Sequence, residues 1–313
     1  MQLVEERIER YTQAYPEIEF KLLFTIDDYE QLVPFTKTFG NDLSNLDYEH
    51  PAELRTTLID AQQHRIIMLL YNGMGSSTLF KTPSAVVTKK PYTCLLTLNH
   101  PVVNQKPITS TRFMFDLDEK TLNTMPESLH IDNQDFLLFT LDHEIFHCID
   151  VYTNGPSYPQ TTDPIKACSD RARAESRGDI YATLAHLSRK PGGNLFLANL
   201  ANARTLNLLN WDVEHYTTEI LLALANTSKL STSEDIKTLM QQSMQLAEEM
   251  TPTHAEHLQF LAAAWHVVQK FGLDTDAIPD DYAILADERP DPDIVKSLSN
   301  EINTTISTIY AIP

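Results

Sequence analysis

The first third of the chain contains short apolar runs between polar stretches, a pattern that predicts strands alternating with helices. The apolar runs predict strands at residues 20–26, 65–71, 92–98 and 111–117. The polar stretches predict helices at residues 2–15, 27–39 and 51–64. Gly73, Gly75, Ser76 and Ser77 predict a flexible turn after the second run.

From residue 133 onward, apolar positions recur at helical spacing instead. The predicted helices span residues 133–153, 164–190, 194–207, 211–226, 232–250, 253–271 and 291–309, and residues 274–290 read as an exposed loop or a partly helical linker. We therefore expect an α+β fold. Residues 1–155 would form a mixed α/β part with a small sheet, and residues 156–313 a mainly helical part.

The helix predicted at residues 133–153 has clear boundaries and an unusual interior. Asp132 and Asn133 offer side chains that can cap its first turn, and Asn154-Gly155-Pro156 ends it. Apolar side chains cover much of its circumference, as in a buried helix. Histidines, aspartates and a glutamate on such a helix are costly to bury unless they are used.

Those polar residues include the motif His-Glu-x-x-His at residues 143–147. His143 and His147 are four positions apart, so on a helix their imidazoles share one face and can bind one zinc ion. The carboxylate of Glu144 lies beside them and could take a proton from a zinc-activated water. The motif therefore predicts a catalytic zinc site, although inert core histidines stay open as an alternative.

A third zinc ligand is expected on the next predicted helix. Asp163 and Pro164 are typical of a helix start, and the helix stops near Lys190. Glu175 and Asp179 lie four positions apart on one face of it. Glu175 could complete the three protein ligands of a catalytic zinc, and Asp179 could accept the free N–H of a ligating histidine.

The two segments together resemble the gluzincin group of zinc metallopeptidases, in which a helix bearing Glu-x-x-x-Asp follows the His-Glu-x-x-His helix. The resemblance covers about residues 133–187. It implies a zincin-like fold with Zn²⁺ as cofactor. By analogy, His143, His147 and Glu175 would be the metal ligands, Glu144 the general base, and Asp179 the partner of a ligating histidine.

Zincin folds also place an edge strand of the sheet over the active-site helix, where it binds the substrate backbone by strand addition. Residues 111–117 come just before that helix, so this predicted strand is our candidate. An interior strand is an equally open interpretation of the same residues.

The reaction that follows from the resemblance is hydrolysis of peptide bonds in a peptide or protein substrate. Such a reaction needs a donor that stabilises the oxyanion opposite the metal. The candidates are Tyr152, Tyr158, Tyr181, His215 and Tyr216. His215 is favoured, because it lies beyond both ligand helices and nearby carboxylates could keep it protonated. An ordinary helical histidine remains the alternative.

Three other functions stay open. The zinc could serve an amidase or another hydrolase that does not cut peptides, or the site could belong to a non-catalytic binding protein. The intact Glu144 argues against the latter, because a structural site needs no base. A di-iron bundle would need two Glu-x-x-His motifs. Glu127-x-x-His130 and Glu144-x-x-His147 qualify formally, but a break after the first places it in a loop.

Other histidines fit metal sites less well. The extended metzincin pattern fails, since the positions that need glycine and histidine hold other residues. His254 and His257 are better explained by the helix that a capping box of Thr253 and Glu256 would open. His186 lies three turns beyond Glu175, too far along the helix to share its metal.

Composition sets the background for these expectations. The 313 residues are 42% hydrophobic, and the formal net charge of −19 disfavours nucleic acid as a partner. No apolar run is long enough to predict a membrane span, and the start does not read as a signal peptide. The protein would be cytoplasmic, or exported with its signal removed. Cys94, Cys148 and Cys168 predict no disulfide framework, and Cys148 reads as a packing residue.

Overall fold

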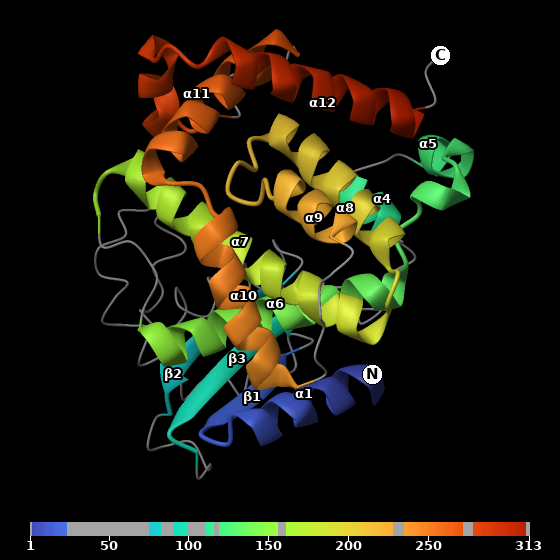
Figure 1. The fold of residues 1–313 in the computed structure, drawn as a ribbon, viewed down its shortest axis with the longest axis vertical. Coiled ribbons are helices and arrows are strands. Elements are labelled where there is room, and N and C mark those ends of the chain that lie inside the picture. The colour runs from blue at the N-terminus through green and yellow to red at the C-terminus, as the bar shows by residue number, and fades with distance from the viewer. Residues whose placement is uncertain are drawn as a thin grey trace, which may run out of the picture.

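The computed structural model describes residues 2–23, 75–82, 90–98, 110–115, 119–155, 161–227, 235–271 and 278–310. A small sheet lies at one end of the molecule and two packed helices lie at the other, with two long helices between them (Figure 1). In chain order the elements are α1 (Gln2–Ala14), β1 (Ile18–Leu23), β2 (Gly75–Lys81), β3 (Tyr92–Leu98), α4 (Ser110–Phe115), α5 (Glu119–Thr124), the 3₁₀ helix η4 (Glu127–Leu129), α6 (Asn133–Asn154), α7 (Pro164–Arg189), α8 (Asn194–Asn207), the 3₁₀ helix η5 (Leu208–Asn210), α9 (Thr218–Asn226), α10 (Ile236–Met250), α11 (His254–Lys270), the 3₁₀ helix η7 (Asp280–Asp287) and α12 (Pro292–Tyr310). The expected α+β class is confirmed.

Within the described residues the sheet has three strands in the order β1-β3-β2. The central strand β3 pairs parallel with β1 and antiparallel with β2, with Ile18 opposite Tyr92 and Gly75 opposite Leu98. The strand predicted at 92–98 is therefore confirmed as β3, and the strand predicted at 20–26 is confirmed as β1 up to Leu23, because residues 24–26 lie outside the described ranges. The predicted flexible turn is wrong for residues 75–77, which begin β2. The predicted strand at 65–71 and the predicted helices at 27–39 and 51–64 lie outside the described residues.

Helices α6 and α7 form the centre of the molecule, and their predicted bounds are confirmed. The Asp132 carboxylate caps α6 by accepting from the backbone N–H of Gln134 and Asp135, and Gly155 ends the helix with φ of 84°. Asp163 caps α7 in the same way. One side of α6 packs on β2 and β3 and the other on α7, which explains why α6 is apolar on nearly every face.

The predicted strand at 111–117 is wrong, because residues 110–115 form helix α4. The buried positions Ser110, Thr111, Met114 and Phe115 follow helical spacing, and the last two pack in a core cluster with α6 and α8. The Thr111 hydroxyl also accepts from the backbone N–H of Ile131, just before α6. In a short apolar run the period alone does not separate strand from helix, and here tertiary packing decided.

The predicted helices of the second half match α8, α10, α11 and α12 within a few residues, and the capping box of Thr253 and Glu256 at the start of α11 is confirmed. The helix predicted at 211–226 starts late, at Thr218. Trp211 adopts a left-handed φ of 61°, and its indole packs against Trp265 and Tyr282. This conformation interrupts helical propagation, so residues 211–217 form a turn.

A buried ionic network joins α1 to α6 and α7. The Asp142 carboxylate accepts from Arg7 Nε at 2.7 Å and from the Tyr11 hydroxyl at 2.6 Å. It also pairs with Arg189, and Tyr11 bonds to the hydroxyl of Tyr181 at 2.8 Å. Burial alone would raise the pKa of Asp142, but Arg189 and Arg7 outweigh it and lower that pKa. The charge pairing makes this buried carboxylate tolerable.

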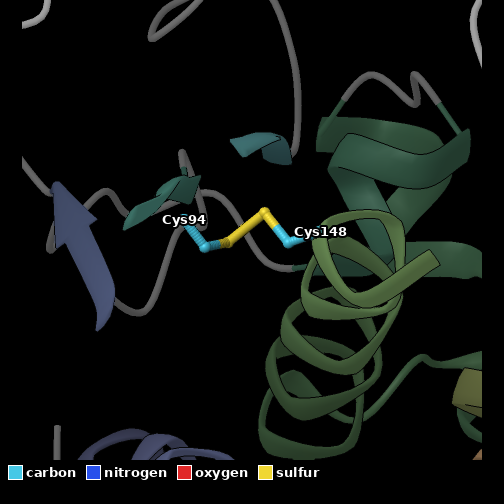
Figure 2. Close-up of a disulfide and its surroundings, with 2 residues drawn as sticks. All are labelled: Cys94 and Cys148. Carbon is cyan, nitrogen blue, oxygen red and sulfur yellow. A yellow bond between two sulfur atoms is a disulfide. The ribbon is translucent and has the colours of Figure 1, made fainter. Parts of the chain in front are cut away.

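A disulfide between Cys94 and Cys148 connects β3 to α6 (Figure 2). The expectation of no disulfide, with Cys148 as a packing residue, was therefore wrong. The two cysteines are 54 positions apart in the chain, and only the packing of α6 on the sheet brings their Cα atoms to 5.9 Å. Cys168 is free and buried. Because Cys148 follows His147 directly, the disulfide anchors the turn of α6 that carries the second motif histidine.

We expect the double variant Cys94→Ala/Cys148→Ala to lose about 4 kcal/mol of unfolding free energy, because the crosslink restricts a long loop of the unfolded chain. Urea denaturation of the variant and of the reduced wild type measures the loss. Cys168→Ala removes a buried thiol but leaves the disulfide intact, so it is the control and should lose as much further stability on reduction as the wild type does. Alkylation of the unfolded, unreduced wild type should modify one thiol, and modification of all three would contradict the disulfide.

His257 on α11 is buried without a hydrogen-bond partner. Its side chain is 4% exposed, and neither ring nitrogen has a partner among the described residues. Burial, followed by the positive charges of His254 and Arg173, lowers the pKa of His257 to about 4. The folded protein therefore holds this imidazole neutral, whereas the unfolded chain protonates it at its ordinary pKa near 6.5.

This difference predicts a loss of stability in acid. Below pH 6.5 the unfolded chain binds a proton that the folded protein rejects, so stability falls as the pH drops from about 6.5 to about 4, by about 3 kcal/mol at most. We expect His257→Leu to remove this slope and to raise stability at neutral pH. Urea midpoints measured across this range test the prediction. The exposed neighbour substitution His254→Ala should keep most of the slope, and an unchanged slope in His257→Leu would refute the assignment.

Within the described ranges, no helix combines the length and the apolar character needed to cross a membrane.

Candidate metal centre

Helices α6 and α7 bring three potential metal ligands together. His143 Nε2 lies 3.0 Å from His147 Nε2 and 2.9 Å from Glu175 Oε2, and His147 Nε2 lies 3.6 Å from the same Glu175 oxygen. Ligands of one tetrahedral zinc, each about 2.0–2.1 Å from the ion, are about 3.3 Å apart, so this spacing fits a single ion. The cluster of His143, His147 and Glu175 could hold a metal.

The other ring nitrogen of His143 is fixed by Asp179. His143 Nδ1 lies 2.8 Å from Asp179 Oδ1 and donates to this carboxylate, which leaves Nε2 facing Glu175 and His147. Asp179 is fully buried and also accepts from Arg204 Nη2 and the Thr217 hydroxyl. Its carboxylate is thus held from three further elements and sets both the tautomer and the orientation of the His143 ring.

Gly178 allows His143 to lie flat against α7. A Cβ atom at position 178 would come within 2.8 Å of His143 Cε1 and 2.9 Å of Nδ1. Any side chain here would push the imidazole away from Glu175 and Asp179. The close contact between the two helices at the cluster therefore depends on this glycine.

Glu144 follows His143 on α6, and its side chain packs against strand β2. A Cβ atom at Gly75, the first residue of β2, would lie 2.8 Å from Glu144 Cγ and 3.0 Å from Thr140 Cγ2. The backbone of β2 therefore rests directly on the Glu144 side chain. Burial raises the pKa of Glu144 against the opposing charges of His143 and His147.

His215 reaches the cluster from the turn before α9. Its Nε2 lies 3.3 Å from Glu175 Oε2, and its Nδ1 lies 2.6 Å from Asp212 Oδ1. The left-handed turn at Trp211 places both residues of this pair outside a helix, where Asp212 can orient the ring. The favoured candidate for the oxyanion donor thus lies beside the metal cluster, with one ring nitrogen turned toward it.

The carboxylates of Glu175, Asp179 and Asp212 lie close together around the histidines and favour the binding of a cation. Burial alone would lower the pKa of His143, but Asp179 and Glu175 outweigh it and raise that pKa to about 10. Glu175 and Asp212 likewise raise the pKa of His215 to about 10 against burial. Burial would raise the pKa of Glu175, but His147 and His215 hold it well below its ordinary value. A divalent cation would take the place of the protons that these carboxylates hold on the imidazoles.

The remaining candidates have other partners. Tyr181 bonds to Tyr11, Tyr216 donates to Glu301, and Tyr152 packs edge-on against Tyr15 and Tyr92. Tyr158 lies outside the described residues. The Nε2 atom of His186 lies 3.3 Å from the carbonyl oxygen of Gly193, in the core. The first of the two motifs needed for a di-iron site, Glu127-x-x-His130, lies on η4 and takes no part in the metal-capable cluster.

Several residues of the site carry no signal of their own in the sequence. Arg204 on α8 and Thr217 before α9 both bind Asp179, and nothing in their local pattern points to it. Gly75 and Gly178 make close contacts that only the packing reveals. Asp212 could have been found, because its spacing of three from His215 suits a local hydrogen bond in a turn.

Comparison of the chain with protein families, with curated proteins and with solved structures found no match. An interpretation of the site therefore rests on the geometry of these residues alone.

Proposed function

We propose that this protein is a zinc-dependent peptidase of the zincin type, with His143, His147 and Glu175 as the zinc ligands. The observation that carries the proposal is the convergence of these three donor atoms within bonding distance of one ion. The proposal is supported by the groups around them. Asp179 fixes one ligand, Glu144 interacts electrostatically with both motif histidines, and His215 of the Asp212–His215 pair contacts Glu175.

Zinc, when bound, would activate a water molecule and polarise the carbonyl of the scissile peptide bond. The proton transfers of hydrolysis are then carried out by residues of this chain. Glu144 takes a proton from the attacking water and delivers it to the departing amine. The buried position of Glu144 against β2 keeps its carboxylate beside the motif histidines instead of in bulk solvent.

His215 is the donor proposed for the oxyanion that forms during the attack. Asp212 accepts from its Nδ1–H, which turns Nε2, 3.3 Å from Glu175 Oε2, toward the centre as the atom that would donate to the oxyanion. Its imidazole is the most exposed of the three at the site, 39% against 8% for His143 and 17% for His147, which suits contact with a substrate. Arg204 donates to the Asp179 carboxylate and orients it.

The edge strand β2 replaces residues 111–117 as the candidate for binding the substrate backbone. Among the described strands it lies at the edge of the sheet, and it pairs antiparallel with β3 and rests on Glu144 through Gly75. An extended peptide added along its outer edge would run past the general base. This arrangement favours a peptide over a compact small amide as the substrate.

Metal analysis of the purified protein tests the proposal directly. We expect one zinc per chain in the wild type and loss of zinc binding in His147→Ala and Glu175→Ala, because two remaining protein ligands hold zinc weakly. His186→Ala is the control for loss of a histidine and should retain the zinc. A wild-type chain that binds no zinc, or an equal zinc content in all variants, would refute the proposal.

A further inference from the structure

A cavity lies on the far side of α7 from the metal cluster of His143, His147 and Glu175. It has a volume of about 640 Å³ and lies among Tyr15, the end of α6, the first half of α7, and α10. Figure 1 shows α10 running across α7, and the two helices are in contact. Arg173 and Arg177 line the cavity, whereas Glu175 and Asp179 face the metal. Two positions along a helix correspond to a rotation of about 200°, so the two sites lie on opposite faces of α7.

The cavity collects cations in a chain that has few of them. Arg173, Arg177 and Lys237 line it, with Glu248 as the one carboxylate among its lining residues. The chain as a whole has 24 lysines and arginines against 43 aspartates and glutamates. Because carboxylates outnumber cations in this chain, most arginines are expected to pair with one. Arg7, Arg171, Arg189 and Arg204 each pair with one.

Of the three cations of the cavity, only Arg177 pairs with a carboxylate among the described residues. Arg177 pairs with Asp150 through Nη2, but its Nε is buried and has no acceptor among the described residues. Arg173 donates to the carbonyl oxygen of Pro252, and Lys237 lies over the Tyr15 ring at 5.9 Å. Neither pairs with a carboxylate in the part of the chain that the structure describes. These donors leave capacity for an oxyanion.

The rest of the lining combines uncharged polar side chains with an apolar wall. Met240, Met244 and Ala247 of α10 form one wall, and methionine side chains adapt to ligands of varied shape. The volume lies within the range of roughly 300–1,000 Å³ typical of sites for small organic molecules. An ion as small as phosphate would leave most of the cavity unfilled, so the lining suits an anion attached to an apolar body.

We propose that this cavity binds a small organic anion, with a carboxylate or phosphate group held by Arg173, Arg177 and Lys237 and an apolar group against Met240 and Met244. The site is independent of zinc and lies outside the proposed reaction centre. Its ligand would contact α7 on the face opposite to the one that carries Glu175.

Isothermal titration of the full chain with phenyl phosphate and with phenylacetate tests the proposal. We expect saturable binding of at least one of them at one site per chain, and no binding of the neutral analogue benzyl alcohol. The comparison of the two anions shows which oxyanion the site prefers. Absence of binding by both anions at millimolar concentration, or equal binding of benzyl alcohol, would overturn the proposal.

Variants locate the binding. Arg173→Gln and Lys237→Met change exposed side chains, so the fold should tolerate both, and each should weaken binding roughly tenfold. Lys166→Met removes an exposed cation from the same helix outside the cavity and should leave binding unchanged. Met244→Trp should abolish binding by filling the apolar wall without a change of charge. Unchanged binding in all three cavity variants would place the anion elsewhere and refute the site.

Discussion

Glu144→Gln is expected to lower kcat/KM for peptide hydrolysis roughly 10³-fold while the protein keeps one zinc per chain. The amide has nearly the shape of the carboxylate, so it should still fit against β2. It cannot accept the proton of the attacking water. Hydrolysis of a denatured protein substrate and of a peptide library, with zinc content measured on the same samples, gives both quantities.

The controls for this variant separate the competing functions. Glu127→Gln changes an exposed glutamate on η4 and should alter neither activity nor zinc, whereas a di-iron site built on Glu127 would lose its metal. Small amides assayed beside the peptides distinguish a peptidase from an amidase. If wild type and Glu144→Gln hydrolyse peptides equally well, Glu144 is not the base, and a non-catalytic metal site becomes the better interpretation.

Asp142→Asn is expected to lose about 3 kcal/mol of unfolding free energy. The substitution leaves Arg7, whose side chain is 4% exposed, and Arg189 without the carboxylate that neutralises them. Removing one member of a buried ion pair is costly because the remaining charge stays desolvated. Urea denaturation of the zinc-free protein measures this cost without a contribution from metal binding.

The matched control for this prediction lies on the same helix. Asp135→Asn breaks the pair with Lys190, whose side chain is 57% exposed, and should change stability by less than about 1 kcal/mol. The contrast between the two variants isolates the effect of burial. A small loss in Asp142→Asn, equal to that of the control, would show that the network contributes little to the fold.

The sequence predicted those features of the site that depend on interactions between residues close together in the chain. The spacing of His143 and His147 on one helix face is set within one helical turn, and Asp132, Gly155 and Asp163 define helix ends through bonds to near neighbours. These features follow from local chemistry. Glu175 was nominated from the helix face that it shares with Asp179 and from a resemblance, but no local rule says which face of α7 meets α6.

The errors fall where a local pattern permits two outcomes. Residues 110–115 are too few for the period of their apolar positions to distinguish helix from strand, and the contact of Met114 and Phe115 with α6 and α8 settled them as helix. Gly75 reads as a turn residue in the sequence. In the structure it starts a strand, because only glycine lets β2 approach Glu144 so closely.

The sequence by itself determined the two central helices, their ends, and a pair of imidazoles on one face beside a carboxylate. Only the tertiary structure decided that Glu175 reaches those imidazoles, that Asp179 is held by Arg204 and Thr217, and that Cys94 joins Cys148. The reason is that helix formation depends on residues three or four apart. The crossing of α6 and α7, and the packing of α6 on the sheet, depend instead on the shape of whole faces contributed by distant segments.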